Sequence, residues 1–163
     1  ALDCSSNTRS NVVVHAMRSL LILIGPNLNL LGTRQVEVYG TTTLAEIEAD
    51  CIAFAQSCGA TAHCAQSNHE GVLVDAIHAA RGTHDGIILN AGAYTHTSIA
   101  LLDAITSSQI PTLELHLSNI HSREAFRHKS YISLAAIGVI AGFGPNGYQL
   151  AIRAMLDHLE SVT

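Results

Sequence analysis

The sequence predicts an α/β fold in which helices cover both faces of a five-stranded parallel sheet. Three observations predict it. Five short apolar runs alternate with stretches of helical period, each run stops at a polar or glycine cluster, and the helical stretches begin with capping patterns or end before glycine or proline. Alternating strands and helices require right-handed crossovers, which make neighbouring strands parallel.

The apolar runs are the expected strands, and the clusters that follow them carry side chains suited to acid/base chemistry. In open α/β sheets, ligands bind outside the carboxyl ends of the strands, so we expect a site along that rim. The runs are residues 20–24 before Gly25-Pro26-Asn27, 60–65 before Gln66-Ser67-Asn68, 86–89 before Asn90-Ala91-Gly92, 113–117 before Ser118-Asn119, and 137–141 before Gly142-Phe143-Gly144.

Capping patterns predict the first two helices. Thr43-Leu44-Ala45-Glu46 has the Ser/Thr-x-x-Glu spacing of a capping box and predicts a helix to about Cys58. The sequence Ser67-Asn68-His69-Glu70 repeats the pattern and predicts a helix that stops near Gly82. Further helices are expected over 98–108 and 146–160, with a short helical turn over 123–127. This alternation is typical of a flavodoxin-like three-layer sandwich.

The 163 residues suffice for one domain with one core, which we place at 19–163 as a single catalytic domain. Residues 1–18 do not match the rest. They are polar at first and lack the features of a secretory signal, so they are interpreted as an N-terminal extension or cloning remnant without assigned function, with Met17 as a candidate start.

Composition limits the compartment and the partners. Hydrophobic residues make up 48% and charged residues 13%, without an apolar run long enough for a membrane span, so we expect a cytoplasmic protein that does not bind membranes. The net charge is −5 and no basic stripe is present, which argues against a nucleic-acid partner. The sparse charge favours a homo-oligomer. The four cysteines lack Cys-x-x-Cys spacing and are interpreted as small core residues in a reducing cytosol.

A long segment, residues 27–42, separates the first strand from the first helix. Loops of this length in compact domains are usually functional or disordered. Arg34 and Tyr39 lie on it between Gly32 and Gly40, which fits an active-site lid. An exposed surface loop is the alternative.

Glu114 and His116 share one face of the fourth expected strand because side chains alternate along a strand. A carboxylate beside an imidazole fixes its tautomer and raises its proton affinity, as an acid catalyst requires. The alternative is a hydrogen-bonded core histidine. The position at a strand end favours catalysis.

Other polar residues near the strand ends suit an anionic, hydroxylated small molecule. Asn27 and Asn90 offer both donor and acceptor, although either could simply close a turn. Further donors are His96, Ser118, Arg123 and Arg127, together with the amides after Leu117.

Rival motifs are absent from the sequence: it has no Walker loop, Gly-x-Gly-x-x-Gly after the first strand, Gly-x-Ser-x-Gly or His-Glu-x-x-His. The single lysine, Lys129, lies outside the strand-end clusters, which argues against imine catalysis. The ten histidines are scattered, so no metal is expected.

Six motifs match a family. They are GPNLNLLGTR (25–34), VYG (38–40), QSNHEG (66–71), NAGAYTHTS (90–98), ELHLSNIHSREAFRHKSY (114–131) and GVIAGFGPNGY (138–148). Together they resemble type II 3-dehydroquinate dehydratase over nearly everything from Ser19 to His158. The resemblance implies a lyase of the shikimate pathway of aromatic amino acid biosynthesis that needs no metal or cofactor. Its reaction converts 3-dehydroquinate to 3-dehydroshikimate and water by anti elimination through an enolate.

The resemblance also implies roles for individual residues. Tyr39 would be the base that removes a proton from C2, and Arg34 beside it would favour tyrosinate. Asn27 would position a water at the enolate oxygen, and His116, oriented by Glu114, would protonate the departing C1 hydroxyl. Asn90, Ser118 and the backbone amide of Leu117 would bind the substrate carboxylate. His96 and Arg127 would bind the ring hydroxyls, and a neighbouring subunit would contribute Asp103. The family forms trimers that assemble into dodecamers.

Two departures from the family pattern lie near these residues. Ile24 stands where the family usually has a polar residue before Gly25-Pro26-Asn27, so we expect the contacts that support Asn27 to differ from those in the family. Gln35-Val36 replaces a frequent Glu-Pro pair, and losing the proline raises the entropy cost of lid closure.

Two other functions remain open at this point. A flavodoxin-like binding or signalling domain would need a flavin phosphate loop or an acidic phosphoacceptor cluster with a strand-end lysine, and neither is in the sequence. Another dehydratase or isomerase could use the same enolate chemistry on a related ring acid. The fold would not separate these functions, whereas the motifs favour the dehydratase.

Overall fold

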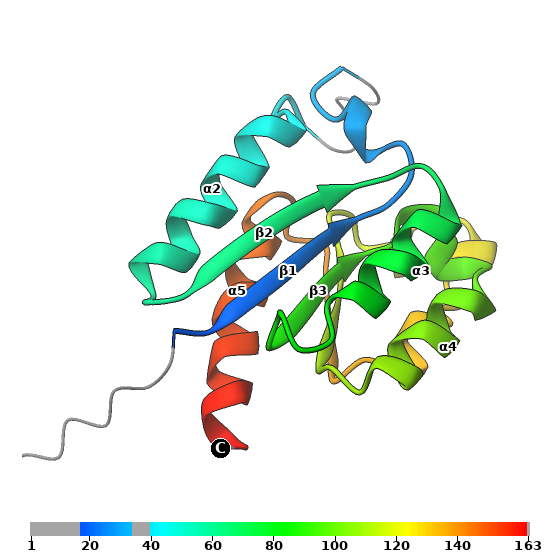
Figure 1. The fold of residues 1–163 in the computed structure, drawn as a ribbon. Coiled ribbons are helices and arrows are strands. Elements are labelled where there is room, and N and C mark those ends of the chain that lie inside the picture. Colours follow the sequence, from blue (N-terminus) through cyan, green and yellow to red (C-terminus); the bar gives the residue numbers. More distant parts are fainter. Residues whose placement is uncertain (1–16, 34–39, 163) are drawn as a thin grey trace, which may run out of the picture.

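The computed structural model describes residues 17–33 and 40–162, and in it five strands form one parallel sheet (Figure 1). The strand order is β2-β1-β3-β4-β5, which is the flavodoxin-like order. The predicted α/β fold is therefore confirmed. The strands are β1 (Ser19–Ile24), β2 (Thr61–Gln66), β3 (Gly86–Asn90), β4 (Thr112–His116) and β5 (Gly138–Ala141).

Helices cover both faces of the sheet. The helices α3 and α4 lie together on one side (Figure 1), whereas α2 and α5 pack on the other. Their bounds are α2 (Leu44–Ser57), α3 (Glu70–Ala79), α4 (Ile99–Ser108) and α5 (Asn146–Ser161). Short 3-10 helices follow the strand ends: η1 (Leu28–Leu30), η2 (Gly92–His96), η3 (Ile120–Ser122), η4 (Ala125–Arg127) and η5 (Ile132–Leu134).

The alternation of side chains along the strands builds two cores. On β1, Leu20 and Ile22 face α2 and α5, while Leu21 and Leu23 face α3 and α4. A parallel strand buried on both faces is apolar at nearly every position, because neither face meets water. The apolar runs at β1, β3 and β4 therefore correspond to strands buried on both faces, whereas the edge strands β2 and β5 are only partly buried. Among the described residues no helix is long and apolar enough to cross a membrane.

One of the two predicted capping boxes forms. The Thr43 hydroxyl accepts a hydrogen bond from the amide of Glu46 at 3.3 Å, and the Glu46 carboxylate accepts from the amide of Thr43 at 2.8 Å. These two bonds satisfy amides that have no partner inside α2. They fix the start of α2 immediately after the segment that carries Arg34 and Tyr39.

The prediction of a second capping box, at Ser67 and Glu70, was wrong. The N-cap of α3 is His69, whose side chain makes no capping bond. Ser67 lies two residues earlier, and its hydroxyl accepts from the amide of His69 at 3.0 Å. Because β2 continues to Gln66, the chain needs Ser67 and Asn68 to turn toward α3, so the serine closes that turn instead of capping the helix.

Gly25 lets the ends of β1 and β3 approach closely, since its amide donates to the carbonyl of Asn90 at 2.8 Å. A Cβ at this position would lie 2.5 Å from the carbonyl oxygen of Ala91. Gly25→Ala should therefore force the two strand ends apart and lower the free energy of unfolding by about 1–3 kcal/mol, measured by urea denaturation. The control is Gly71→Ala in α3, where a Cβ meets no atom within 4 Å. Equal stability of Gly25→Ala and the wild type would contradict this packing.

Candidate active site

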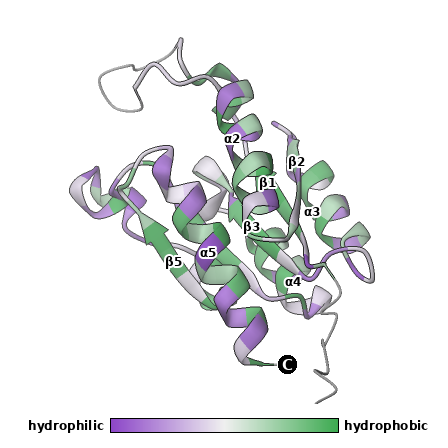
Figure 2. Ribbon diagram, turned by 90° about the vertical axis from the view of Figure 1, so that its left-hand side faces the viewer, coloured by the Kyte–Doolittle hydropathy of each residue, from purple (hydrophilic) through white to green (hydrophobic). Residues whose placement is uncertain are grey.

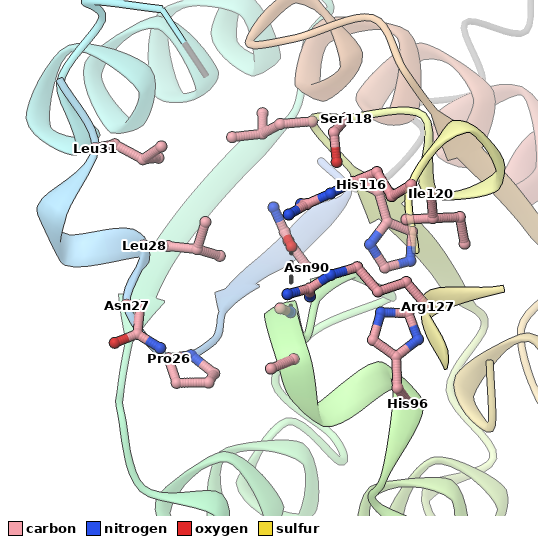
Figure 3. A pocket seen from close by; sticks show the side chains of 14 residues that line it. Pro26, Asn27, Leu28, Leu31, Asn90, His96, His116, Ser118, Ile120 and Arg127 are labelled. Atoms are coloured by element: carbon pink, nitrogen blue, oxygen red, sulfur yellow. Dashed lines mark hydrogen bonds between the residues drawn. The ribbon is translucent and has the colours of Figure 1, made fainter. Parts of the chain in front are cut away.

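A cavity opens at the carboxyl ends of β1, β3 and β4 (Figure 3). The strand order reverses between β1 and β3, and this is where open α/β sheets form their ligand crevice. The figure shows His96, His116 and Arg127 on one side of the cavity and Asn27 with Leu28 on the other. The predicted residues that line it are Asn27, Asn90, His96, His116, Leu117, Ser118, Arg123 and Arg127, and they are joined by Pro26, Leu28, Leu31, Gly92, Ala93 and Ile120.

The Glu114 and His116 side chains form a buried pair on one face of β4. Nε2 of His116 lies 2.6 Å from Oε1 of Glu114, with Glu114 fully buried and His116 5% exposed. The neighbouring Leu113 and Leu115 point into the opposite core, as the alternation predicts. A buried carboxylate needs hydrogen-bond donors, and the imidazole supplies one of them.

This pairing fixes how His116 meets the cavity. Because the carboxylate accepts, Nε2 carries the proton in that bond, and Nδ1 is the remaining ring nitrogen. Among the described residues no group binds Nδ1 of His116. When the imidazole is charged, the proton that it can deliver to a ligand is the one on Nδ1.

His96 is oriented by a backbone carbonyl. Its Nδ1 lies 2.7 Å from the carbonyl oxygen of Lys129, so Nδ1 carries the proton and Nε2 of the neutral ring is an acceptor. The rings of His96 and His116 are nearly parallel, with 6.4 Å between their centroids and 12° between their planes. The cavity therefore has two nearly parallel imidazoles, His96 with Nδ1 engaged and His116 with Nε2 engaged.

Asn90 is held from two directions at the end of β3. Its Nδ2 donates to the Tyr148 hydroxyl at 3.2 Å, and its Oδ1 accepts from the amide of Gly92 at 3.3 Å. Burial raises the pKa of Tyr148 well above its usual range, with the hydrogen bond from Asn90 opposing the effect. The phenol therefore stays neutral, and the amide of Asn90 keeps one N–H and one lone pair for a ligand.

Asn27 is held through its backbone. It adopts the left-handed conformation with φ 65°, and its amide donates to Oδ1 of Asn68 at 2.9 Å. Gln66 donates to the same oxygen at 3.1 Å, and the Tyr94 hydroxyl donates to the Asn68 carbonyl at 2.8 Å. Neither Asn68 nor Tyr148 was among the predicted site residues. Asn68 stands in the polar cluster after the second strand and could have been selected on that ground, whereas Tyr148 lies in α5 and gave no local signal.

Glu124 pairs with both arginines at the mouth of the cavity. Nε of Arg127 lies 2.9 Å from its carboxylate, and Nε of Arg123 lies 3.5 Å away. The pKa of the Glu124 carboxyl is lowered mainly by a hydrogen bond from the backbone amide of Glu124 and also by the hydrogen bond from Arg127. The pairs are partly exposed, so water screens them, and a ligand carboxylate or hydroxyl can compete for the guanidinium groups.

Four predicted site residues do not line the described cavity, and one of them is Glu114, which is fully buried and bonds His116. Arg34 and Tyr39 lie outside the described residues. Asp103 is on the exposed side of α4 and does not line the cavity of its own chain. In the part of the chain that the structure describes, no three histidine, cysteine, aspartate or glutamate side chains come together as a metal ion would require.

Comparisons with known proteins point to one family. The family model described as Dehydroquinase class II matches residues 18–156. A 3-dehydroquinate dehydratase of Ruegeria pomeroyi is 66% identical over 144 residues, covering 88% of this chain and 97% of the relative. A catabolic 3-dehydroquinase of Aspergillus flavus is 52% identical over 143 residues, covering 88% and 95%.

Solved structures agree with the sequence matches. The type II dehydroquinase of Butyrivibrio crossotus superposes with a TM-score of 0.85 at 39% identity, covering 87% of this chain and 99% of that one. That of Propionibacterium acnes gives a TM-score of 0.84 at 36% identity, covering 88% and 99%. The similarity therefore extends over the strands and loops that build the cavity.

Proposed function

Because the chain belongs to the dehydroquinase class II family, we propose that it dehydrates 3-dehydroquinate to 3-dehydroshikimate and water by anti elimination through an enolate. The observation that carries the mechanism is the buried Glu114–His116 pair, which borders a cavity with amide, hydroxyl and guanidinium donors. A flavodoxin-like binding domain has no need of an acid catalyst at this position. The reaction lies in the shikimate pathway.

Proton removal is the first step. Tyr39, as tyrosinate, takes the proton from C2, and the electron pair moves onto the C3 carbonyl oxygen as an enolate. Arg34 lies five residues away on the same segment and stabilises the anionic phenolate by its charge. Asn27, beside the cavity, holds a water whose hydrogen bond to the enolate oxygen strengthens as negative charge develops.

Loss of the hydroxyl is the second step. The enolate reforms the C3 carbonyl and drives out the C1 hydroxyl, which takes the Nδ1 proton of His116 and leaves as water. Glu114 holds Nε2 and stabilises the imidazolium before the transfer. The proton taken by Tyr39 and the proton given by His116 balance over one turnover, and exchange with solvent restores both groups.

The cavity residues bind the remaining groups of the substrate. The remaining N–H of Asn90, the Ser118 hydroxyl and the amide of Leu117 take the carboxylate. His96 accepts a hydrogen bond from a ring hydroxyl through Nε2, and Arg127 donates to another. Asp103 completes the site from a neighbouring subunit.

The apolar edge of the sheet supports self-association. β5 is an edge strand, and Figure 2 shows its hydrophobic residues at that open edge. Val139 is 48% exposed, Leu134 72% and Phe143 62%. An apolar strand edge left open to water favours association, so we propose a homo-oligomer, namely a dodecamer built from trimers. Analytical ultracentrifugation that finds only the 17.2 kDa chain as a monomer would contradict this assembly.

Direct assay tests the function. Purified protein given 3-dehydroquinate should generate the ultraviolet absorbance of a conjugated enone, and extensive dialysis against a chelator should leave the rate unchanged. Quinate is the matched control, because without the C3 ketone it cannot form the enolate and should not react. No absorbance from folded, oligomeric protein would refute the function.

A further inference from the structure

Three successive residues, Lys129–Tyr131, each make a hydrogen bond to the site. Their partners are His96, the carboxylate that bonds His116, and the residue before His96. The Lys129 carbonyl accepts from Nδ1 of His96 at 2.7 Å. The Ser130 hydroxyl donates to Oε1 of Glu114 at 2.8 Å. The Tyr131 amide donates to the carbonyl of Thr95 at 2.9 Å. This segment, named here the 129–131 clamp, therefore joins the loop that carries Arg127 to β4 and η2.

The hydrogen bonds on Glu114 are distributed unevenly. Oε1 accepts from His116 at 2.6 Å, from Ser130 at 2.8 Å and from Thr95 at 3.3 Å. Oε2 is buried and has no partner among the described residues. A carboxylate could turn to present either oxygen to the imidazole. The hydroxyls of Ser130 and Thr95 donate to the same carboxylate oxygen as Nε2 of His116. They therefore define which oxygen of Glu114 faces His116, and they stabilise the negative charge of that carboxylate.

We infer that Ser130 is a positioning residue for the acid catalyst, acting through Glu114 to hold Nε2 of His116 and so aim Nδ1 at the cavity. The inference rests on the proposed function, in which His116 is the acid. Ser130 touches neither the cavity nor the reacting atoms, since it is absent from the cavity lining. Its effect should therefore fall on the chemical step and not on substrate binding.

The two histidines take opposite tautomers because Lys129 of the clamp bonds His96 and Glu114, itself bonded by Ser130, bonds His116. His96 has its proton on Nδ1 because a carbonyl can only accept, whereas neutral His116 has its proton on Nε2 because the carboxylate accepts there. Lys129 and Ser130 are adjacent in the chain. One short segment thus supports an acceptor for a substrate hydroxyl and a donor for the leaving group.

A purely structural role for Ser130 is the competing explanation. Its oxygen also accepts from the amide of Ser133 at 3.0 Å, at the start of η5. Ser133 provides a matched control because its own hydroxyl donates to the Ser130 carbonyl at 3.2 Å and has no bond to Glu114. Loss of local turn stability should affect Ser130→Ala and Ser133→Ala alike, whereas loss of positioning should affect Ser130→Ala alone.

Steady-state kinetics separate the two roles. Ser130→Ala should lower kcat about tenfold, as expected for one lost hydrogen bond to a charged group, and leave KM within about twofold. Ser130→Thr, which keeps the hydroxyl, should recover most of the loss, and Ser133→Ala should match the wild type. Should Ser130→Ala fail to fold, Thr95→Val removes the longer bond with little change of shape and should lower kcat by a smaller factor.

Spectroscopy of the free enzyme provides a readout that does not depend on turnover. In protein labelled with ¹⁵N-histidine and sedimented for solid-state NMR, Ser130→Ala should move the His116 ring nitrogen resonances and Ser133→Ala should not. Wild-type kcat and unmoved resonances in Ser130→Ala would overturn the inference, as would equal losses in Ser130→Ala and Ser133→Ala. Moved resonances together with an inactive wild type would instead count against the proposed function alone.

Discussion

Replacing His116 by glutamine should lower kcat about a hundred- to ten-thousandfold, the range that a positioned general acid supplies. Glutamine can still donate to Oε1 of Glu114, so the buried carboxylate keeps a partner and the fold should persist. It has no titratable proton to give to the departing hydroxyl. Turnover is measured by the enone absorbance, and folding by circular dichroism and thermal unfolding.

A control substitution at His78 and a threshold for the loss of kcat make the His116→Gln result decisive. His78→Gln changes an exposed residue near the end of α3 and should leave kcat unchanged. If His116→Gln kept kcat within about tenfold of the wild type, below the range of general acid catalysis, His116 would be removed as the acid. The buried pair would then be interpreted as a structural ion pair.

Replacing Tyr39 by phenylalanine should reduce kcat by a similar factor, about a hundred- to ten-thousandfold, because the ring remains and only the base is lost. KM should change little, since the carboxylate and ring hydroxyls are bound by other residues. Near-normal turnover in this variant would exclude Tyr39 as the base.

Isotope exchange separates the base from the acid. In deuterated water, the wild type should exchange the C2 proton of 3-dehydroquinate with solvent through the enolate. Tyr39→Phe should lose this exchange, because no enolate forms. His116→Gln should retain it while failing to release water, because its defect comes after the enolate. Loss of exchange in His116→Gln together with retention in Tyr39→Phe would reverse the two roles.

Most of the fold could be predicted because its signals are local. The apolar runs became strands whose ends differ from the predicted ones by at most one residue, and Thr43 with Glu46 formed the predicted capping box. The prediction at Ser67 was wrong because the pattern Ser-x-x-Glu does not show where the preceding strand ends. The chain uses Ser67 to turn from β2 toward α3.

The candidate site could be predicted in part. Asn27, Asn90 and His116 were expected together because each stands at or just after a strand end, and parallel strands bring those ends to one rim. Tyr148 and Ser130 were not expected. Tyr148 bonds Asn90 from 58 positions away and Ser130 bonds Glu114 from 16 positions away, with no periodic pattern linking them.

The sequence by itself determined the strands, the helices and the set of polar groups at the rim, because periodicity and capping depend on residues a few positions apart. Only the tertiary structure decided which oxygen faces His116, which nitrogen of His96 is protonated and what holds Asn90. Those choices depend on hydrogen bonds between segments that the crossovers of the sheet bring together, and hydrogen bonds require positions defined to a fraction of an ångström. A linear pattern of residue types does not contain that information.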